Sequence, residues 1–464
     1  MKPDVSTWIA QRGYRFAGMA LYPFLRPALL YRVRKGKEDR ARLNERLGHA
    51  AVARPDGPLV WIHAASVGET LAVAPLIEMV RGYGISILLT TGTVTSARLA
   101  AERFGDRVIH QYVPVDTTPS VRNFLDHWRP DLAVNVETEV WPVTIAELNR
   151  RRVAHIIVNG RISDRSFDRW MMRRGLARSL FSRFACILTQ TDLDAERFSD
   201  LGALNVGVSG NIKVDREAPP ADPREVGLLQ ESIGSRPVWA AISTFEGEEQ
   251  AAAEVHLSLK ARFNRPLTII VPRHPNRAEA IALQLQEQGL KVARRSCGDP
   301  LEPDTDILLG DTMGDMGLYL RLTRIAFVGR SLTARGGQNP LEPAMLGAAV
   351  LTGRNVDNFR EAYRQLRQRG AVRTVDSVEA LRQSVELLMR DAKARETMVS
   401  AGFEAVREMR GALARTMKGL ERYLAPLILE ARFCAKSKSV KQPSHHSSDV
   451  LKRVPEAQAS KIAR

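Results

Sequence analysis

The chain has 464 residues, of which 44% are hydrophobic and 26% are charged. This length accommodates two or three domains, and the composition argues against a disordered chain, a fibre or a multi-span membrane protein. The 68 Lys and Arg residues outnumber the 52 Asp and Glu residues and give a net charge of +16. We therefore expect an anionic partner, which the charge alone leaves open between nucleic acid, an acidic membrane surface and a phosphorylated substrate.

The excess charge lies at the two ends of the chain. Residues 1–49 contain 11 basic and 4 acidic side chains, and residues 432–464 contain 8 basic and 2 acidic ones, so the body between them is nearly neutral. Nucleic-acid enzymes more often carry a basic stripe across the folded body, which disfavours nucleic acid as the partner. The three cysteines are widely spaced without a CxxC pair, so we expect reduced thiols in an intracellular protein, with neither a disulfide framework nor a zinc site.

The N-terminal segment 1–49 has the pattern of a membrane-surface anchor. Aromatic and aliphatic residues between positions 8 and 30 are interspersed with Arg and followed by further Arg and Lys up to Lys37, as in helices that lie on anionic headgroups. The apolar run at 16–25 is interrupted by Pro23, Arg26 and Pro27 before it reaches the roughly 20 residues of a bilayer span. A helix packed on the protein body and a short tilted span remain the alternatives.

From residue 59 onward, short apolar runs alternate with amphipathic segments, which predicts βαβ units and parallel sheets. The first series predicts strands at 59–64, 85–90, 107–113, 131–136, 153–159 and 186–190. The second series predicts strands at 237–243, 267–272, 306–310, 325–329 and 349–353. We therefore predict an α/β protein with two Rossmann-like domains, 50–216 and 237–405, that face each other across a central cleft.

Segments of other character lie between and after these two domains. Pro219, Pro220, Pro223 and Gly234 within 217–236 predict a linker. Residues 406–431 are predicted as a C-terminal helix, and the Lys-, Ser- and His-rich residues 432–464 as a basic disordered tail.

Ligands of such sheets bind at the carboxyl ends of strands, so the loops there are the candidate sites. In the first domain, Ser66 and Glu69 follow a strand and form either a helix capping box or a carboxylate placed to accept a proton. Glu137 and Glu139 follow another buried strand. They are either acids at a helix N-terminus or carboxylates that take part in a functional site. Lys213 is either solvated or directed at an anion in the cleft.

Three loops of the second domain suggest phosphate binding. Pro272 and Arg273 follow one strand, and an arginine there can make two hydrogen bonds to a phosphate. The segment 311–315 follows a second strand. After a third strand, two glycines precede a predicted helix start with Asn339 as N-cap, Pro340 at N1 and Glu342 at N3, where free amides favour an anion. Because the three loops lie on one sheet edge, we expect a nucleotide phosphate.

These motifs together resemble a known enzyme family. The segments WIHAASVGE, ETEVWP, NGRISDRS, SGNIKVD, STFEGEE, VPRHPNR, DTMGDMGLY and FVGRSL with GGQNPLEP occur in the order and spacing of the 3-deoxy-D-manno-octulosonic acid (Kdo) transferases of lipid A biosynthesis. The resemblance covers residues 5 to 425. It implies a GT-B fold, CMP-Kdo as donor, lipid IVA as acceptor, and attachment to the cytoplasmic face of the inner membrane through an N-terminal helix. It implies no cofactor and no catalytic metal.

The resemblance also implies roles for particular residues. Glu69 matches the family's general base, while Glu137 and Lys213 match residues that stabilise the transition state. The positions that match the CMP site are Pro272, Arg273, Met313, Gly314, Asp315, Asn339, Pro340, Leu341 and Glu342. Attack on the face opposite CMP would invert the anomeric centre.

Four positions depart from the family pattern. Asp315 stands where Glu is common, Phe245 and Gln338 where His is common, and Arg330 where Gly is common. A histidine role at 245 or 338 is therefore untenable in this chain. The alternatives to a Kdo transferase are another nucleotide-sugar enzyme that uses UDP, such as an epimerase or a lipid A disaccharide synthase, or a membrane- or nucleic-acid-binding module.

Overall fold

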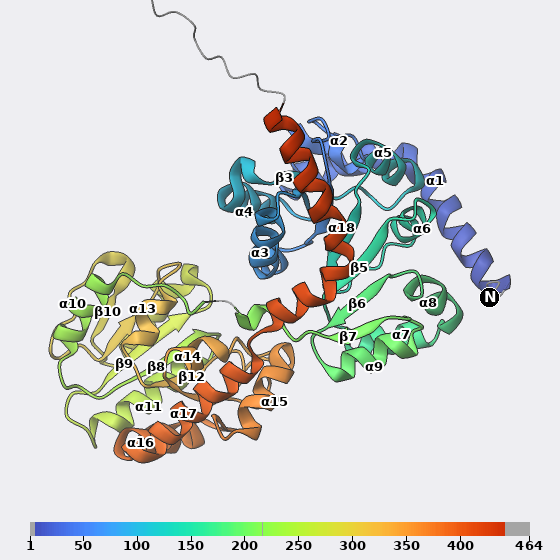
Figure 1. The fold of residues 1–464 in the computed structure, drawn as a ribbon. Helices are drawn as coiled ribbons and strands as arrows, with labels where there is room; N and C mark the ends of the chain where they lie inside the picture. The colour runs from blue at the N-terminus through green and yellow to red at the C-terminus, as the bar shows by residue number, and fades with distance from the viewer. Residues whose placement is uncertain (1–4, 216, 441–464) are drawn as a thin grey trace, which may run out of the picture.

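The computed structural model describes residues 5–215 and 217–440 and contains two α/β domains, each built on a parallel seven-stranded sheet (Figure 1). The first sheet has the order β3-β2-β1-β4-β5-β6-β7. Its strands are β1 (Leu59–His63), β2 (Ser86–Thr91), β3 (Ile109–Tyr112), β4 (Leu132–Val136), β5 (Ala154–Gly160), β6 (Cys186–Thr189) and β7 (Val206–Val208). Its helices are α3 (Val67–Gly82), α4 (Val94–Phe104), α5 (Thr118–Trp128), α6 (Pro142–Arg150), α7 (Asp164–Met171), α8 (Arg174–Phe181) and α9 (Asp192–Asp200).

The second sheet has the order β10-β11-β9-β8-β12-β13-β14, again with parallel pairing throughout. Its strands are β8 (Val238–Thr244), β9 (Leu267–Pro272), β10 (Val292–Arg294), β11 (Ile307–Leu309), β12 (Ile325–Val328), β13 (Ala349–Thr352) and β14 (Val372–Thr374). Its helices are α10 (Pro223–Ile233), α11 (Glu248–Lys260), α12 (Ala278–Glu287), α13 (Met316–Arg321), α14 (Leu341–Met345), α15 (Arg360–Gln368), α16 (Val378–Arg390) and α17 (Ala392–Met409).

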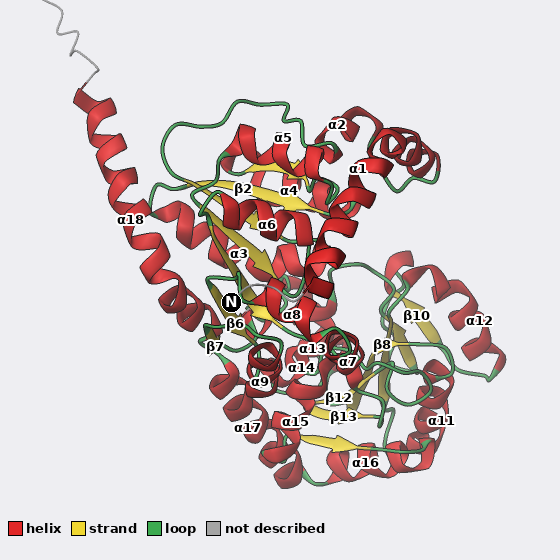
Figure 2. Ribbon diagram, turned by 90° about the vertical axis from the view of Figure 1, so that its right-hand side faces the viewer, coloured by secondary structure: helices red, strands yellow, loops and turns green. Residues whose placement is uncertain are grey.

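Helices cover both faces of each sheet, so the central strands are buried on both sides (Figure 2). In β1, Val60 and Ile62 face one apolar core, while Leu59 and Trp61 face the other. Strands with two buried faces read as continuous apolar runs rather than as an alternating pattern. This explains why all eleven strands predicted from apolar runs are present.

Three strands, β7, β10 and β14, were not predicted. Each has only three residues and forms an outer edge of its sheet. An edge strand is half-solvated, as the exposed Val208, Arg373 and Thr374 show. Its residues therefore lack the apolar run by which the central strands were recognised.

The predicted linker at 217–236 is largely a helix of the second domain. Helix α10 begins with Pro223 at its first turn, capped by Asp222, and its Ile233 belongs to the core of the second domain. One of the prolines that suggested a linker, Pro223, is in the first turn of a helix. A backbone N–H at that position has no partner within the helix, so its absence in proline costs nothing.

The C-terminal region also differs from the prediction. Helix α17 ends at Met409, and a separate helix α18 (Ala412–Val440) continues nine residues into the predicted disordered tail. Residues 441–464 of that tail lie outside the described residues. Leu420, Leu424 and Leu427 of α18 are buried in the core of the first domain, so the chain returns from the second domain to close the first (Figure 1).

Helix α1 (Val5–Arg34) lies against α5 and α8 at the outside of the first domain. Gln11 donates a hydrogen bond to Ser179 Oγ at 2.6 Å, and Tyr14 donates one to Asp116 at 3.1 Å. The helix nonetheless exposes large apolar side chains, among them Phe16 at 75%. Among the described residues, no helix is both long and apolar enough to cross a membrane.

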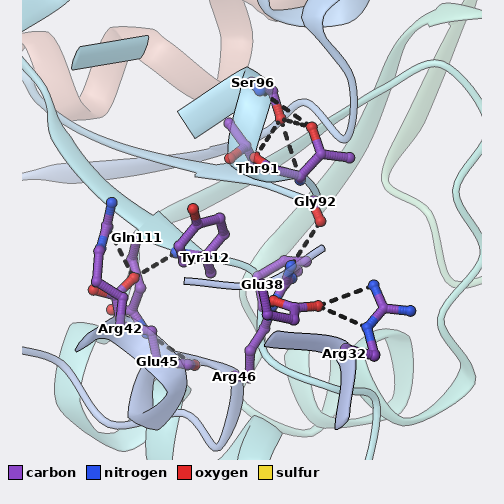
Figure 3. Close-up of polar contacts among 12 residues, drawn as sticks. Arg32, Glu38, Arg42, Glu45, Arg46, Thr91, Gly92, Ser96, Gln111 and Tyr112 are labelled. Carbon is purple, nitrogen blue, oxygen red and sulfur yellow. Dashed lines mark hydrogen bonds and ion pairs between the residues drawn. The ribbon is translucent and has the colours of Figure 1, made fainter. Parts of the chain in front are cut away.

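A buried ion-pair network joins the end of α1 to the first sheet (Figure 3). Glu38 pairs with Arg32 and with Arg46, at 2.9 Å in each case, and the Glu38 and Arg46 side chains are almost fully buried. Arg46 also donates to the carbonyl of Gly92 at 2.6 Å. The Gly92 amide in turn donates to Ala65 O in the loop after β1. The segment after α1 therefore supports the loop that leads to Glu69.

Replacing Arg46 by methionine should strongly destabilise the first domain. The change leaves the buried carboxylate of Glu38 with only the half-exposed Arg32 as partner, and breaking a buried pair costs about 3–5 kcal/mol. The control is Arg81→Met, which removes a partly exposed pair with Glu78 on the surface of α3 and should cost less than about 1 kcal/mol. Urea unfolding measures both, and equal losses would contradict a special contribution of the buried pair.

Candidate active site between the two sheets

The topology places the candidate residues at the switch point of each sheet. Strand β1 lies between β2 and β4, and the chain runs outward to β3 before it returns to β4. In the second sheet, β8 likewise lies between β9 and β12. Ligands of open parallel sheets bind beyond the carboxyl ends of the strands at such points. The carboxyl edges of the two sheets meet, since Arg360, after β13, pairs at 3.1 Å with Asp164, after β5.

Glu69 is both a capping residue and a candidate base, so the two interpretations of this motif are compatible. Ser66 is the N-cap of α3 and accepts from the Glu69 amide at 3.3 Å. The Glu69 carboxylate in return accepts from Ser66 Oγ at 2.7 Å and from the Ala65 amide at 2.8 Å. These bonds fix the side chain but use only part of the acceptor capacity of a carboxylate.

Burial raises the pKa of Glu69, and the nearby charge of Glu137 raises it further, against the lowering effects of Ser66, Ala65 and His63. A raised carboxyl pKa is characteristic of groups that exchange protons near neutral pH. Glu69 and Glu137 follow β1 and β4, which pair side by side, so the two acids lie beyond neighbouring strand ends.

Glu137 and Lys213 form an ion pair across this site. Lys213 Nζ lies 2.6 Å from Glu137 Oε1, with the two side chains 35% and 27% exposed. Glu137 is the first residue after β4 and has a left-handed backbone with φ of 61°, held by its amide donating to Val158 O. Lys213 lies in a short 3-10 helix (Ile212–Asp215) whose first amide donates to Asn159 Oδ1. The three predicted catalytic residues are therefore brought together.

The second acid of this loop, Glu139, is held by contacts with Trp141 and His63. Its carboxylate accepts from the Trp141 indole at 2.8 Å and lies 3.7 Å from His63 Nε2. Burial acts to raise the pKa of Glu139, but the His63 and Trp141 interactions outweigh it and hold this pKa below its usual value. Glu139 is therefore held ionised by its neighbours and does not share the raised pKa of Glu69.

Strand β9 presents Arg273 at its carboxyl end. The Arg273 amide donates to Thr244 O at 3.0 Å, which fixes the backbone, while the side chain is exposed. Pro272 is buried and ends the strand. In the part of the chain that the structure describes, the Arg273 guanidinium has no carboxylate partner, so its donors remain open to an anion.

The other two predicted nucleotide loops lie at the ends of β11 and β12. Gly314 has a φ of 96°, which allows the loop to turn before α13, and Met313 is 78% exposed. Asp315 accepts from Thr312 Oγ1 at 2.6 Å, so the shorter acid is held within its own loop. Of the remaining predicted residues, Leu341 is buried and Glu342 is half-buried.

The predicted start of the helix after β12 is wrong by one residue. Pro340 is the N-cap, so helix α14 begins at Leu341 and has only five residues. Asn339 still accepts from the Leu341 amide at 3.1 Å and donates to Glu342 at 3.1 Å. Asn339 forms an Asx turn, which has the same sequence pattern as an N-cap because in both the side chain accepts a hydrogen bond from a following backbone amide.

Glu248, for which no role was predicted, connects the loops at the switch point of the second domain. This buried carboxylate accepts from the amides of Phe245, Arg330, Ser331 and Leu332 at 2.7–3.0 Å. It thereby joins the loops after β8 and β12. The acid pair at the end of STFEGEE could have suggested a role for Glu248. Acids are also common at a helix N-terminus, however, so the pair by itself does not indicate that role.

The described residues include no group of three or more His, Cys, Asp or Glu side chains that could hold a metal ion. The site instead consists of a carboxylate with a raised pKa, an acid–lysine pair, and arginines with glycine-rich loops on the facing domain. Such a set can remove a proton from a hydroxyl and bind an anionic leaving group.

Comparison with known proteins agrees with this arrangement. Residues 41–216 match the model of the 3-deoxy-D-manno-octulosonic-acid transferase (kdotransferase) family. The chain is 35% identical to the 3-deoxy-D-manno-octulosonic acid transferase of Haemophilus influenzae over 84% of this chain and 93% of the relative. It is 36% identical to the Bordetella pertussis protein of the same name, over 82% and 91% of the two chains.

Solved structures support the architecture. The Anabaena HepE structure in complex with UDP covers 82% of this chain with a TM-score of 0.52 at 12% identity, and all of HepE is matched. A Rickettsia africae glycosyltransferase covers 81% of this chain, with a TM-score of 0.53 at 10% identity, and is itself fully matched. At these identities the likeness extends to the fold alone, which is of the GT-B type. With its relatives and its motifs, the chain belongs to the Kdo transferase family of glycosyltransferases.

Proposed function

We propose that the chain transfers Kdo from CMP-Kdo to lipid IVA, the tetraacyl disaccharide 1,4′-bisphosphate, with release of CMP and inversion at the anomeric carbon. The observation that carries the proposal is the grouping of Glu69, Glu137 and Lys213 at the switch point of the first sheet. The sequence resemblance to the Kdo transferases implies these roles, and the chemistry of the three side chains suits the reaction.

In the proposed reaction, a hydroxyl of the acceptor glucosamine attacks the anomeric carbon while the bond to the CMP phosphate breaks. The hydroxyl proton passes to the Glu69 carboxylate, whose raised pKa makes it a stronger base than an ordinary glutamate. The sugar passes through an oxocarbenium-like state that the charge of Glu137 stabilises. Lys213 balances Glu137 and stabilises negative charge that develops on the departing phosphate.

On the donor side, Arg273 is proposed to bind the phosphate together with the loops that contain Gly314 and Asn339. Arg273→Ala should weaken CMP binding by about 10- to 100-fold, because a hydrogen bond to a charged group contributes about 1.5–3 kcal/mol. Calorimetry with CMP measures this, and the exposed Arg324, paired with Glu396 at the amino end of β12, supplies the control Arg324→Met. An Arg273→Ala variant that binds CMP like the wild type would refute the phosphate role.

Helix α1 is proposed to hold the enzyme on the cytoplasmic side of the inner membrane. Its apolar side chains Phe16, Leu21 and Phe24 are more than half exposed, next to basic residues along the same helix. This combination suits the interface of an anionic bilayer, where the acceptor lipid lies. Sedimentation with vesicles that contain anionic lipid tests this: the triple variant Phe16→Ser, Leu21→Ser, Phe24→Ser should lose binding and retain transfer to detergent-solubilised acceptor.

Mass spectrometry of lipid IVA after incubation with CMP-Kdo tests the proposed reaction and gives the number of Kdo residues added. The expected result is a mass increase of one or more Kdo units that depends on CMP-Kdo. An unmodified acceptor, with turnover of a UDP-sugar instead, would favour a UDP-dependent enzyme. If neither donor is used, a binding module becomes the better interpretation.

A further inference from the structure

The second domain carries an arginine, Arg330, at its switch point that the assigned nucleotide site does not include. It follows β12 directly after Gly329, and β12 neighbours the central strand β8. Its position in the second sheet corresponds to that of Glu137 in the first. In both places a non-glycine residue with a left-handed backbone lies one or two residues beyond the end of a strand that neighbours the central one, with φ of 57° for Arg330.

The backbone of Arg330 is tied on both sides. Its amide donates to the buried carboxylate of Glu248 at 2.7 Å, and its carbonyl accepts from the Gly337 amide at 2.7 Å. These bonds hold a conformation that disfavours any side chain with a β-carbon. The same bonds fix the direction in which the Arg330 side chain leaves the strand.

The Arg330 guanidinium rests on an aromatic ring rather than on an acid. Its Cζ atom lies 5.1 Å from the centroid of the Phe245 ring, and that ring contacts His274 edge-on at a centroid distance of 5.5 Å. A β-carbon on Gly336 would lie 3.3 Å from Arg330 Nε, so the guanidinium also borders the glycine pair before Asn339. In the described part of the chain, this guanidinium makes no ion pair with an Asp or Glu.

Two arginines that have no acidic partner among the described residues therefore flank Phe245. Arg273 precedes His274, and its amide bonds the residue before Phe245, while Arg330 covers the Phe245 ring from the other neighbouring strand. A cation held on an aromatic face keeps its in-plane N–H groups available. A carboxylate or phosphate oxygen pair matches those donors.

We propose that Arg330 is a donor-binding residue that contacts an anionic group of the sugar nucleotide. The proposal rests on the proposed function, because CMP-Kdo carries two anionic groups, the phosphate and the sugar carboxylate. Arg273 and Arg330, on opposite sides of Phe245, are suited to bind two such groups. Phe245 positions the Arg330 guanidinium through its ring.

The test compares Arg330→Met with the wild-type full chain in steady-state transfer of Kdo to detergent-solubilised lipid IVA. We expect the KM for CMP-Kdo to rise about 10- to 100-fold in Arg330→Met, since a bidentate charged contact is lost. Arg330→Lys keeps the charge without the planar fork and should fall between the two. The control Arg324→Met, at the opposite end of β12, should leave the KM unchanged.

Arg330→Gly separates binding from a structural effect. Glycine adopts a positive φ without strain, so this variant should melt at or above the wild-type temperature and yet show the same rise in KM. If its KM rises only together with a lower melting temperature, the residue acts through stability and the proposal is overturned.

Calorimetry with CMP identifies the bound group. Weaker binding of CMP to Arg330→Met assigns the arginine to the phosphate, whereas unchanged CMP binding with a raised KM for CMP-Kdo assigns it to the carboxylate. Wild-type KM and wild-type CMP affinity in Arg330→Met overturn this proposal and leave the proposed function intact. Absence of any Kdo product from the wild-type chain overturns both.

Discussion

Glu69→Gln should reduce kcat for Kdo transfer by about 10²- to 10⁴-fold, the range expected when a general base is lost. Glutamine is isosteric with glutamate but accepts no proton at its amide. It still accepts one of the two bonds now made by Ser66 Oγ and the Ala65 amide. CMP binding should be unaffected, because Glu69 lies in the first domain and the predicted CMP residues in the second.

The matched control for Glu69→Gln is Ser66→Ala, which removes the N-cap of α3 and leaves the carboxylate in place. Loss of an N-cap costs about 1 kcal/mol of stability, so this variant should melt earlier and retain kcat within about tenfold. Glu69 has a merely capping role if both variants lose stability equally and Glu69→Gln turns over near the wild-type rate.

Lys213→Met should reduce kcat by about 10²- to 10³-fold, comparable to the removal of one preorganised transition-state donor. It also leaves the Glu137 carboxylate without the ammonium that lies 2.6 Å away. Lys213→Arg preserves the charge and should recover part of the rate. A full rate in Lys213→Met under saturating CMP-Kdo would contradict a role in the chemical step.

The pH profiles of activity should shift in opposite directions when Glu137 and Lys213 are replaced one at a time. Activity requires ionised Glu69 and therefore falls as the pH drops through its raised pKa. Glu137→Gln removes a charge that raises this pKa, so the acid limb should move to lower pH. Lys213→Met leaves that charge uncompensated, so the acid limb should move to higher pH. Profiles of kcat against pH measure both shifts, and identical acid limbs would exclude coupling of Glu137 to the base.

The central strands, the two Rossmann-like units and the loops of the candidate site could be predicted from the sequence alone. A strand buried on both faces must be apolar along its length, so Leu59 to His63 or Leu267 to Pro272 are recognisable locally. The candidate loops followed from the rule that ligands bind beyond carboxyl strand ends. The capping box formed by Ser66 and Glu69 could be predicted from the sequence. Which charged side chains lie near Glu69 in the folded chain could not be predicted.

Contacts between segments that lie far apart in the sequence became known only from the folded chain. Lys213 meets Glu137 across 76 positions of the sequence, and Arg330 covers Phe245 because β8 and β12 are neighbours in the sheet. Helix α18 closes the core of the first domain from the far end of the chain. Hydrophobic periodicity reports whether a residue is buried but not what it is buried against, since strand order selects the partner. That order brings the charge of Glu137 close to Glu69, and among the described residues it gives Arg330 no acidic partner.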